Sequence, residues 1–176
     1  MKKYNHRFHP SILREYDIRG IINQTLFEKD AFMIGYFFGL ICKEKNPNKM
    51  PKILISMDGR LSGPDLKKQT KLGLSKSGCN VIDLGLNPTP ILYFGNHNLK
   101  TDGAIQVTGS HNPKDYNGFK MILNNEPFFG RNIQTLAKKA EFGSDTDMNG
   151  NIENINLDEK LIKKILMPLC ETKNLK

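Results

Sequence analysis

Hydrophobic and polar positions alternate along the chain with two different periods, and together they predict an α/β protein. Short apolar runs bounded by proline or glycine are typical of buried strands, and they occur at residues 52–58, 80–85 and 103–108. Amphipathic stretches with the period of a helix separate these runs, at residues 63–78 and 88–99. The order β-α-β-α-β predicts a layered sheet with parallel strands.

A longer apolar stretch at residues 30–46 predicts a helix before the first of these strands. Asp30 is a candidate N-cap, since its carboxylate can accept hydrogen bonds from the first backbone amides of the helix. Gly35 and Gly39 lie about one turn apart, so we expect this helix to pack closely against the sheet. The apolar run at 31–42 is shorter than the roughly 20 residues that cross a bilayer, which predicts no membrane span.

The apolar run at residues 119–123 predicts one further strand. Only about ten residues connect it to the preceding strand, which is too short for a parallel crossover, so it should pair antiparallel. Asn117-Gly118, just before it, is a typical hairpin turn. We therefore expect a three-layer α/β/α domain with a mixed, mostly parallel sheet of about four strands and one antiparallel strand.

The pattern changes after a helical stretch at residues 132–142. Residues 143–151 are small and polar without periodicity, which is typical of a linker, and an apolar stripe at 156–169 predicts a last helix. We expect residues 1–142 to form the α/β/α domain. Residues 143–176 are expected to form a linker and a helix that lead toward a second domain, which the sequence does not include.

Composition and charge narrow the classes of function. The 176 residues carry 26 Lys and Arg against 18 Asp and Glu, a formal net charge of +8, which is compatible with a nucleic acid, an acidic membrane or an anionic small substrate. The basic residues are scattered and do not interleave with aromatic residues, so we expect no nucleic acid and no membrane as partner. Three isolated cysteines (Cys42, Cys79 and Cys170) and an N-terminus without an apolar signal segment predict a cytoplasmic protein.

A serine stands in an unusual position within GAIQVTGSHNPKDYNGFKMIL, residues 103–123. Gly109 before it can adopt positive φ and allows a close approach of backbone or phosphate. Pro113 after it stiffens the loop. Ser110 lies between them at the end of a predicted strand, where ligands gather in α/β sheets. A hydroxyl among cations there suits phosphate chemistry. The cations that the sequence can supply are His111, Lys114, Lys120, Arg19 and Arg60.

Two other interpretations of Ser110 stay open on these residues alone. A serine-hydrolase nucleophile needs a base and a third group that orients the base. The G-x-S-x-G sequence is absent, and the adjacent His111 is poorly placed to act as that base. The second alternative is that Gly109 to Pro113 only connect two strands.

Four motifs in a fixed order extend beyond this loop. They are REYDIRGI at 14–21, DGRLSGPDL at 58–66, NPTPILYF at 87–94 and TGSHNPKDYNGFK at 108–120. Together they resemble the first domain of the α-D-phosphohexomutases, and within that family the bacterial phosphomannomutase/phosphoglucomutase group. The resemblance covers the chain from about residue 8 onward. It implies an isomerase, an intramolecular phosphotransferase that moves phosphate between the 1- and 6-positions of a hexose through a bisphosphorylated sugar.

The resemblance also implies roles for individual residues. Ser110 would be the phosphoserine that donates the phosphoryl group and takes one back, and Mg²⁺ would bind its phosphate, so that Ser110 is a metal ligand only through that group. Lys120 would stabilise charge and transfer a proton, and His111 would flank the same pocket. Arg19 would contact the phosphate, and Tyr16 would line the substrate cleft. Glucose or mannose 1,6-bisphosphate would act as activator.

Three of these residues also have a purely structural interpretation. Tyr16 could be an amphipathic core aromatic with its hydroxyl at the rim. Arg19 could form a structural salt bridge, and Lys120 could be an ordinary solvent-facing lysine of a strand.

The chain also lacks parts of the family pattern. The aspartate-rich metal loop, the sugar-reading loop and the distal phosphate-binding loop are not among these residues. The resemblance therefore implies a hexose phosphate and the remaining mutase domains, in cis or in trans, as partners. We expect residues 1–176 alone to be inactive. The alternative is a non-catalytic module that binds a phosphosugar or a partner.

Overall fold

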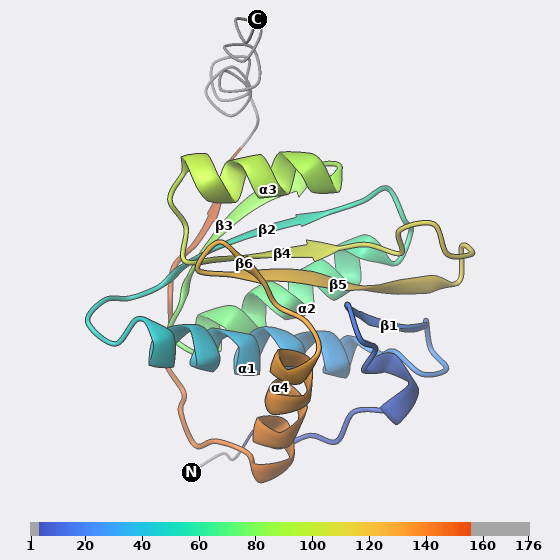
Figure 1. The fold of residues 1–176 in the computed structure, drawn as a ribbon, viewed down its shortest axis with the longest axis horizontal. Helices are drawn as coiled ribbons and strands as arrows, with labels where there is room; N and C mark the ends of the chain where they lie inside the picture. Colours follow the sequence, from blue (N-terminus) through green and yellow to red (C-terminus); the bar gives the residue numbers. More distant parts are fainter. Residues whose placement is uncertain (1–3, 156–176) are drawn as a thin grey trace, which may run out of the picture.

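A mixed sheet of seven strands runs through the middle of the protein and carries helices on both faces (Figure 1). The computed structural model describes residues 4–155. The strands are β1 (Ile18–Ile21), β2 (Lys52–Met57), β3 (Asn80–Leu86), β4 (Gly103–Val107), β5 (Tyr116–Leu123), β6 (Glu126–Pro127) and β7 (Ile152–Asn154). The helices are α1 (Glu28–Lys45), α2 (Gly63–Lys76), α3 (Thr89–Asn98) and α4 (Arg131–Phe142), and a 3₁₀ turn, η1, covers Pro10–Ile12.

The strand order is β1-β5-β4-β2-β3-β7, with β6 paired to β5. β2 is parallel to β3 and β4, and β7 is parallel to β3. β5 is antiparallel to β1, β4 and β6. The predicted three-layer domain, with parallel central strands and an antiparallel strand after them, is confirmed. β1, β6 and β7 are additional to the strands that the hydrophobic pattern predicted.

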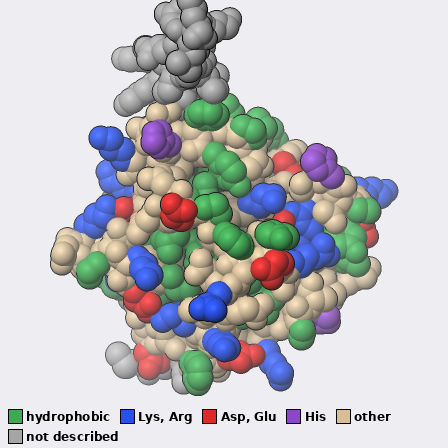
Figure 2. Space-filling view, viewed as in Figure 1, with side chains coloured by type: hydrophobic (Ala, Val, Ile, Leu, Met, Phe, Trp, Pro, Cys, Tyr) green, Lys and Arg blue, Asp and Glu red, His purple; other side chains and the backbone are tan. Residues whose placement is uncertain are grey.

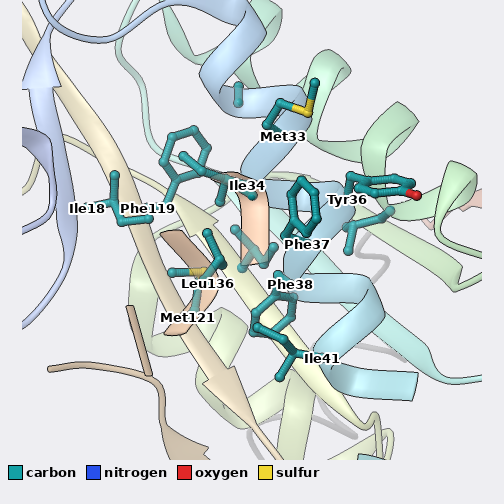
Figure 3. Close-up of a cluster of buried hydrophobic side chains, with 14 of the residues drawn as sticks. Ile18, Met33, Ile34, Tyr36, Phe37, Phe38, Ile41, Phe119, Met121 and Leu136 are labelled. Atoms are coloured by element: carbon teal, nitrogen blue, oxygen red, sulfur yellow. The ribbon is translucent and has the colours of Figure 1, made fainter. Parts of the chain in front are cut away.

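Most of the core lies between the sheet and the layer formed by α1, α2 and α4, whereas α3 covers the opposite face among the described helices (Figure 1). Figure 3 shows Phe37 and Phe38 of α1 among Phe119 and Met121 of β5 and Leu136 of α4. Full burial of a side chain of this size contributes about 1.5–3 kcal/mol. This packing fixes the position of β5, and with it one end of the loop that carries Ser110.

Two details of α1 differ from the sequence prediction. Asp30 is the third residue of the helix and not its N-cap: its Oδ2 accepts a hydrogen bond from the amide of Phe27, the true N-cap residue, at 2.7 Å. Gly35 brings α1 close to α2 and not to the sheet. A β-carbon on Gly35 would lie 2.3 Å from the carbonyl oxygen of Thr70, so only glycine allows this approach.

The predicted turn at Asn117-Gly118 is wrong, because both residues lie inside β5. Gly118 pairs with Arg19 of β1, and a β-carbon on it would lie 2.0 Å from the carbonyl oxygen of Ile18. The glycine therefore serves the close approach of two strands and not a reversal of the chain.

Residues 143–154 lie along the domain. The hydroxyl of Tyr36 donates to the carbonyl of Thr146 at 2.6 Å, and the amide of Gly150 donates to the carbonyl of Ser75 at 2.9 Å. β7 then extends the sheet beside β3. The helix predicted at 156–169 lies outside the described residues, and the division of the chain after residue 142 stays a prediction.

On the face shown in Figure 2, Lys and Arg side chains are interspersed with Asp and Glu. Among residues 4–155, no helix has both the length and the apolar character that crossing a membrane requires.

Candidate functional site

Ser110 lies on the loop that joins the carboxyl end of β4 to β5, and its side chain is exposed. Its φ is +51°, in the left-handed region that non-glycine residues seldom adopt. Gly109, which could have adopted a positive φ, is not among the residues with positive φ. The strained position of the turn therefore belongs to the serine itself.

Asp58, just beyond the end of β2, anchors the start of this loop. Its Oδ2 accepts hydrogen bonds from the hydroxyl of Thr108 at 2.7 Å and from the amide of Gly109 at 3.1 Å. The Thr108 hydroxyl oxygen in turn accepts from the amide of Ser110 at 2.9 Å. Because β2 and β4 are parallel neighbours, their carboxyl ends meet at one edge of the sheet, and this brings Asp58 to the loop.

Arg60 lies against the rest of the loop. Its guanidinium donates to four backbone carbonyls, those of Ser110, Asn112, Pro113 and Tyr116. The sequence analysis predicted Arg60 to be one of the cations near Ser110. The structure brings it to the loop, but its hydrogen bonds go to the backbone.

Arg19 approaches the loop from β1 and is 2% exposed. Its Nη1 donates to the carbonyl of Gly109, and its Nη2 lies 2.5 Å from Oδ2 of Asp17. The same Asp17 oxygen lies 3.4 Å from Nζ of Lys120 on β5. Asp17 thus connects Lys120, through Arg19, to the residue that precedes Ser110.

Tyr16 and His111, the other predicted site residues, lie at the surface. The Tyr16 side chain is 75% exposed, and its ring lies 6.2 Å from that of Phe129. Tyr16 is therefore not a core aromatic. His111 is exposed next to Ser110 on the same loop.

Besides Asp17, sequence reasoning missed two polar residues near this site. Tyr93 of α3 has a raised pKa, because burial disfavours its charged form and the nearby carboxylate of Asp17 adds to that effect. Gln106 of β4 lies opposite Lys120 in the strand register and is fully buried. Its Nε2 donates to the carbonyl of Asn87, whereas its Oε1 has no hydrogen-bond partner among the described residues. A polar residue inside the apolar run of 103–108 was the signal that could have indicated Gln106.

A groove of about 830 Å³ lies beside the loop. Its lining residues include Asp58, Arg60, Leu61, Asn112 and Lys114. Within residues 4–155, no group of three or more His, Cys, Asp and Glu side chains could hold a metal ion. The described part of the chain thus offers an exposed hydroxyl and several cations, but no metal cage of its own.

The fold and this loop define an α/β/α domain that presents one hydroxyl at the edge of its sheet. The family model of phosphoglucomutase/phosphomannomutase, alpha/beta/alpha domain I, matches residues 10–166. The chain belongs to this family and carries its domain I.

Individual relatives agree with this assignment. The chain is 38% identical over 166 residues to a phosphomannomutase/phosphoglucomutase of Pseudomonas syringae pv. tomato, which covers 94% of this chain and 35% of that protein. It is 42% identical over 130 residues to a phosphoglucomutase of Neisseria meningitidis serogroup B, covering 74% of this chain and 28% of that protein. The chain therefore spans about a third of the length of the curated relatives it matches.

Solved structures give the same picture. A phosphoglucomutase/phosphomannomutase family protein from Burkholderia thailandensis superposes with a TM-score of 0.75 at 34% identity, covering 89% of this chain and 35% of that one. A putative phosphomannomutase from Thermus thermophilus superposes with a TM-score of 0.72 at 21% identity, which shows a shared fold.

Proposed function

We propose that this chain is the phosphoserine-bearing domain of a phosphohexomutase, which interconverts hexose 1-phosphate and hexose 6-phosphate through a bisphosphorylated sugar. The observation that carries the proposal is Ser110, an exposed hydroxyl held at an unusual φ of +51° on a loop fixed by buried and half-buried side chains. Conformations of this kind persist only where the surroundings impose them, and they cluster at functional sites.

The transfer step requires one bond to form and one to break. A hydroxyl oxygen of the sugar attacks the phosphorus of phosphoserine 110, the bond from phosphorus to Oγ breaks, and Oγ regains a proton as the sugar hydroxyl loses one. Lys120 is the candidate for this proton transfer and for stabilising the charge that develops. The reverse step returns the other phosphate of the bisphosphorylated sugar to Ser110, and glucose or mannose 1,6-bisphosphate would therefore activate the unphosphorylated protein.

The remaining predicted residues would act around this centre. His111 would flank the phosphate, and exposed Tyr16 would contact the hexose phosphate at the cleft. Arg19 is proposed to contribute positive charge beneath the phosphate, while its bond to the carbonyl of Gly109 supports the loop. A phosphate with a charge of about −1.5 to −2 would be compensated by these cations.

Mg²⁺ is proposed to bind an oxygen of the Ser110 phosphate and to neutralise charge on the transferred group. The residues from 4 to 155 do not fit a metal site by themselves. Any further protein ligands would have to come from other residues, which agrees with a role for additional domains in cis or in trans. We accordingly propose that residues 1–176 alone have negligible mutase activity, and that the complete enzyme works in the cytoplasm.

The test is the phosphorylation of Ser110 in the protein isolated at its natural length from its own cells. Peptide mass mapping should find one phosphoryl group on the peptide that contains Ser110, and none in the Ser110→Ala variant. The phosphate should be lost to hexose 1-phosphate and regained from glucose 1,6-bisphosphate. Absence of phosphate together with tight binding of hexose phosphate would instead identify a non-catalytic phosphosugar-binding module.

The size of the natural product is a second observable. Domains of about 100–150 residues each would make a complete mutase more than twice as long as these 176 residues. A product of this size with mutase turnover, compared with the isolated 1–176 chain without turnover, is the expected result. Turnover by the isolated chain at the rate of the natural form would contradict the proposed dependence on other domains.

A further inference from the structure

The guanidinium of Arg60 donates all four of its Nη protons to backbone carbonyls. A guanidinium carries five N–H groups in a planar fork and no acceptor. Nη1 donates to the carbonyls of Pro113 at 2.5 Å and Tyr116 at 2.8 Å, and Nη2 donates to those of Asn112 at 2.6 Å and Ser110 at 3.0 Å. The fifth donor, Nε, lies 3.5 Å from Oδ2 of Asp58. The four Nη donors of Arg60 are therefore engaged by the backbone, and its Nε forms an ion pair with Asp58.

These acceptors span the whole turn that follows Ser110. Their carbonyls come from four of the seven residues 110–116, and the Arg60 side chain is only 15% exposed. Asp58 contacts both Arg60 and the start of the loop, because it also accepts hydrogen bonds from the hydroxyl of Thr108 and from the amide of Gly109. Arg60 and Asp58 therefore hold opposite ends of one loop.

The loop needs such support, because its central residue is in an unfavourable conformation. Left-handed backbone costs about 1–2 kcal/mol for a non-glycine residue, and Ser110 is in it at φ +51°. The hydrogen bond from Arg60 to the Ser110 carbonyl acts on the peptide group directly after this φ angle. Without it, rotation to an ordinary φ would carry the hydroxyl away from its present direction.

The geometry points to Arg60 as the positioning residue of the serine loop, residues 108–115 between β4 and β5. Arg60 fixes the backbone from Ser110 to Tyr116 and does not bind phosphate itself. This inference rests on the proposed function for its catalytic consequence, but its structural part stands separately. It predicts that loss of Arg60 lowers the rate of phosphoryl transfer and leaves the binding of hexose phosphate nearly unchanged.

The test compares Arg60→Lys with a matched control in the protein at its natural length. Lysine keeps the charge but lacks the planar fork, so it cannot reach four carbonyls at once. The control is Arg7→Lys, because the Arg7 side chain is 86% exposed and forms a surface ion pair with Glu141. Hydrogen exchange is followed at the amides of Asn112 and Tyr116, which donate within the loop to the carbonyls of Gly109 and Pro113.

Arg60→Lys should accelerate exchange at these two amides by about tenfold or more, while the amides of α1 and the Arg7→Lys control keep the wild-type rates. Transfer from phosphoserine 110 should slow by about 100-fold, since small misplacements of a reacting group have effects of that size. KM for hexose phosphate should stay within about twofold. In Arg60→Gly, millimolar guanidinium, but not methylammonium, should restore slow exchange.

Three results would overturn the inference. They are unchanged exchange in Arg60→Lys, a raised KM with an unchanged kcat, and no rescue by guanidinium. If wild type carries no phosphate and transfers none, the proposed function fails, and the exchange data still decide the role of Arg60.

A measurement on wild type covers the case in which the variants do not fold. Nitrogen-15 labelling of arginine should show four separate, slowly exchanging Nη protons for Arg60, as expected for a guanidinium held by four acceptors. A single averaged signal for these protons would overturn the inference without any variant.

Discussion

The α-carbon of Gly109 faces the guanidinium of Arg60 so closely that a β-carbon on Gly109 would lie 1.9 Å from Nε and 2.0 Å from Cζ. The glycine is required for this contact and not for its φ angle, since the positive φ belongs to Ser110. Gly109 thus leaves room for the guanidinium of Arg60, and Ser110 provides the positive φ that the turn requires.

This contact makes Gly109→Ala a sensitive substitution. The added methyl group must displace the guanidinium or the loop, and we expect the free energy of unfolding to fall by about 1–3 kcal/mol. Urea unfolding provides the measurement. Gly59→Ala is the matched control, because a β-carbon on Gly59 meets nothing within 4 Å. Equal stability of the two variants would show that the Arg60 contact can relax without cost.

Ser110→Gly should separate the fold from the chemistry. Glycine adopts positive φ readily, so this variant should be more stable than Ser110→Ala by about 1–2 kcal/mol. Both variants should lack phosphate at position 110, by mass mapping. A lower melting temperature for Ser110→Gly than for Ser110→Ala would mean that the conformation at this position is not strained.

Lys120→Met should affect turnover much more than stability in the natural-length enzyme. Removal of a group that transfers a proton lowers kcat by about 10²–10⁴-fold. Lys120 is half-buried and paired with Asp17 at 3.4 Å, so some loss of stability is also expected. The control is Lys68→Met, because Lys68 is an exposed lysine on helix α2 and not on the sheet that carries Lys120. A loss of kcat below about threefold for Lys120→Met would exclude the proton-transfer role.

Asp83 of β3 gives a prediction about stability and pH. Its carboxylate accepts from Lys67 at 2.8 Å and from Lys71 at 2.6 Å. Burial alone would raise the pKa of Asp83, but these hydrogen bonds and one from the amide of Gly85 outweigh it, and the pKa is lowered below 3.8. Removing one partner of such a buried group leaves the lysines without a counter-charge. Asp83→Asn should therefore lower the free energy of unfolding by about 3–5 kcal/mol at neutral pH.

The sign of the pH dependence follows from the lowered pKa. The ionised carboxylate stabilises the folded protein at every pH above 3.8, and this contribution is lost as the pH falls through the lower folded-state pKa. The difference between wild type and Asp83→Asn should therefore be constant from pH 5 to 8 and shrink only below about 3.8. Urea midpoints across this range test it, and a difference that disappears already at pH 5 would contradict it.

The hydrophobic pattern predicted those elements whose positions depend on apolar burial. β2, β3 and β4 are predominantly apolar, and the structure buries most of their residues between two layers. β1 escaped prediction because a charged residue, Arg19, occupies a buried place in it. β7 escaped because Ile152–Asn154 are exposed and join the sheet only through their backbone.

The residues of the candidate site also fall into those that the sequence could predict and those that it could not. Ser110 could be located from the glycine and proline around it, and Lys120 and Arg19 from the motifs of the family. The role of Arg60 could not be read from the sequence, because its four acceptors are carbonyls that every residue possesses. Asp17 was overlooked because its importance comes from contacts with two residues of different strands, Arg19 and Lys120.

The bracing of the serine loop through its backbone has a consequence for how the protein can evolve. Because Arg60 binds carbonyl groups, we expect the path of the loop not to depend on the side chains at His111, Lys114 and Asp115, all of which are exposed. Substitutions at these positions should change the charge and shape beside Ser110 and leave the turn in place. Evolution can therefore change the side chains around the Ser110 hydroxyl while the backbone conformation of the loop and the fold of the domain stay the same.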